Sequence, residues 1–170
     1  MPNTMEFAIP LCLKEDHDEL RLDLIRAMSK PEPLGSAATS VRESMCAHVF
    51  NKEHCALSLL GLLASLARGE ATPEMLDVVT LTDDLKRDLP AILTSHKRTI
   101  AALKQMIAAA TVVEKPEFVV LAERLMQHIQ IKEQIGYPAA ILIGEFLKLK
   151  LACADNVIHA HKNAGCAGRR

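Results

Sequence analysis

Apolar residues recur every three or four positions along four successive segments of this 170-residue chain. In the first segment Leu13, Leu20 and Leu24 fall on one face of a helix, and no segment alternates apolar and polar residues as a strand does. The composition agrees, since 49 % of the residues are hydrophobic and only 7 are glycine, as is typical of a helical protein with few turns. The sequence therefore predicts an all-α fold.

Signals that start and stop helices divide the chain into four helical regions. We expect helices over residues 11–29, 36–68, 72–110 and 115–160. Gly69 should end the second helix and Pro116 should open the fourth. Pro90 either kinks the third helix or marks its restart, and Gly136-Tyr137-Pro138 should bend the fourth.

The bulk properties exclude several classes of function. The net charge is −1, no basic run exceeds two residues, and 3 % of the residues are aromatic, so neither a nucleic-acid nor a membrane partner is expected. No apolar stretch is long enough to span a bilayer. Five cysteines without a CxxC motif indicate reduced thiols in a cytoplasmic protein. We expect one domain over residues 1–170, with a core over about 9–150 and a frayed tail over about 161–170.

Each predicted helix carries one histidine on its inner face. His17 and His48 are 31 residues apart, and His96 and His128 are 32 apart. Each half of the chain therefore reads as an αα-hairpin with one histidine on each arm. Two such hairpins around a pseudo-twofold axis predict an up-down-up-down four-helix bundle that brings all four imidazoles toward one layer.

A longer sequence motif is repeated around the second histidine of each hairpin. Glu43-x4-His48-x3-Lys52-Glu53 matches Glu123-x4-His128-x3-Lys132-Glu133. A single buried histidine is more often a hydrogen-bonded core residue than a metal ligand. Four neutral imidazoles in one apolar layer would be costly without a cation, however, and imidazole with carboxylate suits iron, zinc or manganese. The repeat therefore favours a metal site.

This order and spacing of motifs resembles the hemerythrin-like, or HHE cation-binding, family. The resemblance rests on His17 in LKEDHDELR, on His48, on His96 and on His128-x4-Glu133 followed by Tyr137-Pro138, and it covers about residues 9–150. It implies a centre of two non-haem irons between four helices, bridged by two carboxylates. The ligands that it implies in this chain are His17, His48, Glu53, His96, His128 and Glu133.

The chain departs from the family pattern at three positions. Lys52 and Lys132 stand where the family usually has glutamate, and Ile92 stands where it often has a second histidine. In a straight helix a residue four positions after a histidine lies about 40° from it and one five positions after lies about 140° away. A π-bulge in each half would bring Glu53 and Glu133 inward, and it would turn Lys52 and Lys132 away, to solvent or against outer acids. The alternative is a solvated Lys-Glu pair beside a degenerate site.

Two functions follow as hypotheses. The first is a hemerythrin-like iron protein that binds or senses dioxygen or a related small ligand, such as nitric oxide or peroxide; another divalent transition metal is an alternative cofactor. The second is a metal-free or single-metal bundle that acts through protein-protein contacts. No general acid or nucleophile stands out, so an enzyme is not expected, although peroxide turnover at an open iron stays an alternative.

Overall fold

The fold is helical throughout the residues that a computed structural model of the chain describes, which are 10–45, 56–72 and 75–166. Side chains are described for residues 10, 18–45, 56–72 and 75–152. In chain order the elements are α1 (Leu11–Met28), α2 (Leu34–Ser44), the 3₁₀ turn η1 (Leu60–Leu62), α4 (Leu63–Ala67), α5 (Leu76–Val112), α6 (Pro116–Ile131), the π-helical segment η3 (Lys132–Gly136) and α7 (Tyr137–Cys166). The described residues contain no strand, which confirms the all-α prediction.

Most of the predicted helix boundaries agree with the structure. Pro116 is the first residue of α6, where the missing N–H of proline leaves no helical hydrogen bond unmade. Gly69 has a φ of 82° and follows α4; its N–H donates to the Leu66 carbonyl, as expected for a left-handed residue that ends a helix. Helix α5 runs through Pro90 without a break, so a restart at that position is wrong.

The second helix differs from the expected single helix over residues 36–68, because α2 ends at Ser44 and its C-cap residue Met45 has a ψ of 75°. The Ser44 hydroxyl donates to the Val41 carbonyl at 2.6 Å, and the Thr99 hydroxyl of α5 lies 3.3 Å from the Ser44 carbonyl oxygen. The Val41 carbonyl also accepts the Met45 N–H at 3.2 Å, so both a backbone and a side-chain hydrogen bond close the last turn of α2. Helix α7 also differs, since it extends to Cys166 across part of the expected tail.

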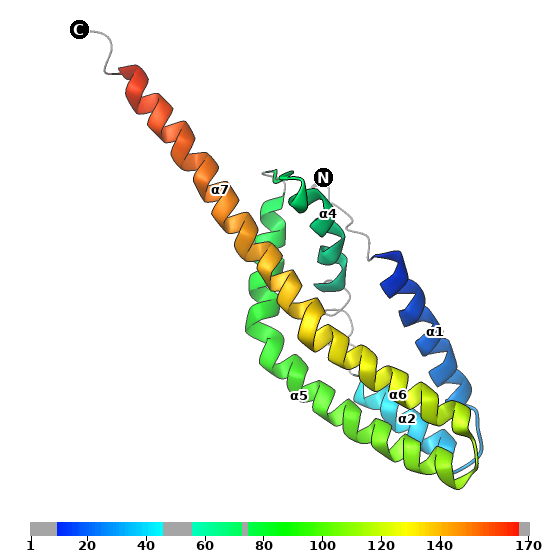
Figure 1. Ribbon diagram of the computed structural model, residues 1–170. Helices are drawn as coiled ribbons and strands as arrows, with labels where there is room; N and C mark the ends of the chain where they lie inside the picture. Colours follow the sequence, from blue (N-terminus) through cyan, green and yellow to red (C-terminus); the bar gives the residue numbers. More distant parts are fainter. Residues whose placement is uncertain (1–9, 46–55, 73–74, 167–170) are drawn as a thin grey trace, which may run out of the picture.

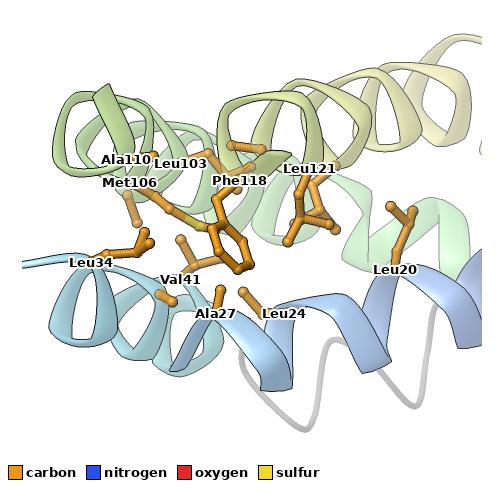
Figure 2. Packing of buried hydrophobic residues seen from close by; sticks show 14 of the residues in the cluster. Leu20, Leu24, Ala27, Leu34, Val41, Leu103, Met106, Ala110, Phe118 and Leu121 are labelled. Carbon is orange, nitrogen blue, oxygen red and sulfur yellow. The ribbon is translucent and has the colours of Figure 1, made fainter. Parts of the chain in front are cut away.

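Helices α5 and α6 form an antiparallel hairpin, and α6, η3 and α7 follow one another as one long rod (Figure 1). The far end of α7 projects beyond the other helices. A first hydrophobic cluster lies at the hairpin end of the molecule, where α1, α2, the second half of α5 and α6 all contribute buried side chains. Figure 2 shows Phe118 of α6 pointing across this cluster toward Val41 and Ala27 of the facing helices.

A second hydrophobic cluster lies farther along the rod. It joins residues of η1 and α4 to the first half of α5 and to α7, and it includes Leu62, Val78, Ile92 and Leu147. On α5 the second cluster ends at Ile92 and the first begins at Ala102. The stretch between these two residues, and the facing stretch around η3, therefore lie at the boundary of two apolar regions.

Candidate functional site

Buried polar side chains gather at the boundary between the two hydrophobic clusters. Among the described residues, His96 and Thr99 of α5, His128 of α6 and Lys132 of η3 are buried. Their positions fall between or beside the last residues of one cluster and the first residues of the other. We call these four residues, together with the half-buried Glu133, the polar layer.

The π-helical segment η3 determines how α6 and α7 face this layer. It consists of the five residues Lys132–Gly136, and the α-helix resumes at the next residue, Tyr137. A π turn holds one residue more than an α turn, so it changes which side chains point inward. The sequence predicted such a bulge in the repeat around His128, and the structure confirms it there.

Glu133 reaches His96 across the helix hairpin. The Nδ1 atom of His96 lies 2.8 Å from Oε1 of Glu133, and the imidazole is 5 % exposed while the carboxylate side chain is 29 % exposed. A carboxylate at this distance forms a charge-assisted hydrogen bond with the ring N–H. The prediction that Glu133 is carried inward is therefore confirmed, although the partner that the structure gives it is a histidine.

Tyr137 occupies the other side of the same imidazole. Its hydroxyl lies 3.4 Å from Nε2 of His96, and the two rings stack with centroids 5.9 Å apart and an interplanar angle of 26°. Tyr137 is fully buried. The sequence marked Tyr137 as part of a bend and of the motif that carries the family resemblance, and gave it no contact with His96. Its spacing of four residues from Glu133 places both side chains on one helical face.

Lys132 contradicts one expectation. A bulge was expected to turn this lysine to solvent or against outer acids, and the first alternative is wrong because Lys132 is 4 % exposed. The wider turn brings Glu133 inward without expelling its neighbour, so both side chains of the Lys132-Glu133 pair enter or border the layer. Both Lys132 and His128 make interactions in the folded chain, as buried polar groups must.

The remaining predicted ligands cannot be compared with this geometry. His48 and Glu53 lie outside the described residues, and His17 lies in α1 with a side chain that is also outside them. Within the described part of the chain, no three His, Cys, Asp or Glu side chains are grouped closely enough to hold a metal ion. The structure thus brings His96 and Glu133 together, and it places His128 buried in the same layer.

Comparison of the chain with protein-family models, curated proteins and solved structures gives no match. Within the described residues, no helix combines the length and the apolar character that a membrane crossing requires.

Proposed function

We propose that this chain is a hemerythrin-like protein that binds iron in its polar layer and, through the iron, dioxygen or a related small ligand such as nitric oxide or peroxide. One observation carries the proposal: Glu133 lies in the π-helical segment and its carboxylate contacts the buried His96 of the facing helix α5 at 2.8 Å. The proposed architecture is an up-down-up-down four-helix bundle made of two αα-hairpins, in which the second hairpin contributes His96, His128 and Glu133.

The donor chemistry of the layer suits this metal. Imidazole nitrogen and carboxylate oxygen are ligands that iron accepts, and the polar layer contains both types. His96, His128 and Glu133 would hold the metal together with His17, His48 and Glu53 of the first hairpin, as the resemblance implies. Bound iron would supply an open coordination position for a small ligand. The buried Leu103 and Leu125 beside the layer would limit the access of water.

A second candidate function is a metal-free bundle that acts through contacts with another protein. It is favoured by the burial of Lys132, since an ammonium group beside a metal cation opposes its binding, and by the engagement of both ring nitrogens of His96. Ile135, Leu142 and Leu149 are also between 63 % and 68 % exposed. They recur every seven residues, which is the spacing of apolar side chains that pack against a partner helix in a coiled coil.

Elemental analysis of the full chain from iron-supplemented cells separates the two candidates. The iron protein is expected to contain about two irons per chain, and His128→Ala and Glu133→Ala should each remove most of it. Gln127→Ala, which changes an exposed neighbour of His128, is the matched control and should leave the iron content unchanged. An iron-free wild-type protein whose thermal stability does not change with a chelator would support the metal-free candidate and contradict the first.

A further inference from the structure

His96 is held from both sides by residues of the rod formed by η3 and α7. Glu133 contacts its Nδ1 atom at 2.8 Å, and the Tyr137 hydroxyl lies at 3.4 Å from its Nε2 atom. Because Glu133 and Tyr137 are four residues apart, a single helical face supplies both contacts. The imidazole itself is 5 % exposed, so bulk water does not compete for either nitrogen.

The chemistry of the two partners assigns the ring proton of a neutral His96. An ionised carboxylate only accepts hydrogen bonds, so Nδ1 must carry the proton that is donated to Glu133. The Nε2 atom then has the lone pair, and the Tyr137 O–H donates to it. A metal ion binds the lone pair of a neutral imidazole, so Nε2 is the nitrogen through which His96 would ligate.

We propose that Glu133 and Tyr137 are the positioning residues of His96, and that the Tyr137 hydroxyl gates its metal-binding nitrogen. Glu133 fixes the tautomer, as carboxylates do for the histidine ligands of metal sites. Tyr137 covers Nε2 until a divalent cation displaces its hydrogen bond. The metal part of this inference rests on the proposed function, whereas the tautomer part stands on the described contacts alone. The inference changes the expected role of Glu133, which would act on the metal through His96.

Nitrogen-15 NMR of histidine-labelled, chelator-treated full-length protein tests the positioning of His96, with His96→Gln used to assign its signals. Wild-type protein should show a protonated Nδ1 and an unprotonated Nε2 at His96. Glu133→Ala should shift the ring toward a mixture of tautomers, and Glu133→Asp should restore the wild-type pattern in part. A wild-type His96 that is protonated at Nε2, whether as the other tautomer or as an imidazolium, would overturn the assignment.

Titration with Co²⁺ alone tests the gate. Tyr137→Phe keeps the ring and removes the hydroxyl, so it should bind Co²⁺ about three- to tenfold more tightly than wild type, which is the expected effect of one net hydrogen bond. Thr82→Val removes a different buried hydroxyl, which donates to the Val79 carbonyl of its own helix, and it should not change the affinity. Equal affinity of Tyr137→Phe and wild type would overturn the gate. If neither protein binds Co²⁺, the proposed function and the gate fail together, while the NMR result still decides the positioning of His96.

Discussion

Helix α7 lies against α5 at Gly144, where there is no room for a side chain. A Cβ atom added to Gly144 would lie 1.8 Å from Oγ1 and 2.6 Å from Cβ of Thr82. Thr82 is buried, with 1 % of its surface exposed, and its Cβ is fixed to the backbone of α5. Because carbon atoms pack at about 3.5–4.0 Å, Gly144→Ala should force the two helices about 1 Å apart.

The expected destabilisation follows from two opposing terms. Overpacking of a filled core costs about 1–3 kcal/mol, and the upper end applies here because no flexible side-chain end can move aside. Alanine is favoured over glycine in a helix by about 1 kcal/mol. The net loss in the free energy of unfolding should be about 2 kcal/mol, which corresponds to a fall in Tm of about 4–8 °C for a chain of this size.

Urea denaturation followed by circular dichroism would measure this loss. Thr82→Gly provides the matched partner, since the double variant Thr82→Gly/Gly144→Ala removes the clash and should be more stable than the sum of the single changes predicts. A Gly144→Ala protein that is as stable as wild type, or more stable, would refute the α5–α7 spacing described here.

Three further predictions concern other parts of the fold. Ser44→Ala removes the hydroxyl that bonds to Val41 and lies 3.1 Å from Thr99 Oγ1, and it should cost about 1 kcal/mol in the free energy of unfolding. Phe118→Ala empties the centre of the first cluster, where Phe118 is 7 % exposed, and should cost about 3–5 kcal/mol by the same measurement. A hydrogen bond from Lys148 lowers the pKa of Glu145 below its ordinary value of 4.5. The stability that this pair contributes should be present in full above pH 4.5 and be lost as the pH falls through the lowered pKa, so Lys148→Ala should make acid unfolding less steep there; unchanged acid curves would contradict this.

The periodic signals of the sequence were sufficient for most of the helices. Apolar spacing and the stop at Gly69 are local properties, and both agree with the structure. The end of α2 at Ser44 was not predicted from such local signals; there the Ser44 carbonyl oxygen lies 3.3 Å from the hydroxyl of Thr99, a residue of another helix 55 positions away. Nothing in the residues around Ser44 breaks the helical pattern.

In the candidate site, too, features set by neighbouring residues were predicted and contacts between distant residues were not. The shared position of Glu53 and Glu133 in the repeat predicted a wider turn, and η3 is that turn around Glu133. The burial of Lys132 was not predicted. From the helical angles we expected that a bulge bringing Glu133 inward would turn Lys132 outward. The contact of Tyr137 with His96 was also missed, since it depends on how α5 and α7 pack across the hairpin.

The polar layer is proposed to hold iron through histidine side chains. X-ray absorption at the iron edge of the iron-loaded full-length protein tests it most directly. We expect a nitrogen and oxygen shell with the scattering signature of imidazole, and a weaker signature in His128→Ala. Iron that is absent, or iron whose spectrum contains no imidazole and does not change in His128→Ala, would contradict the account.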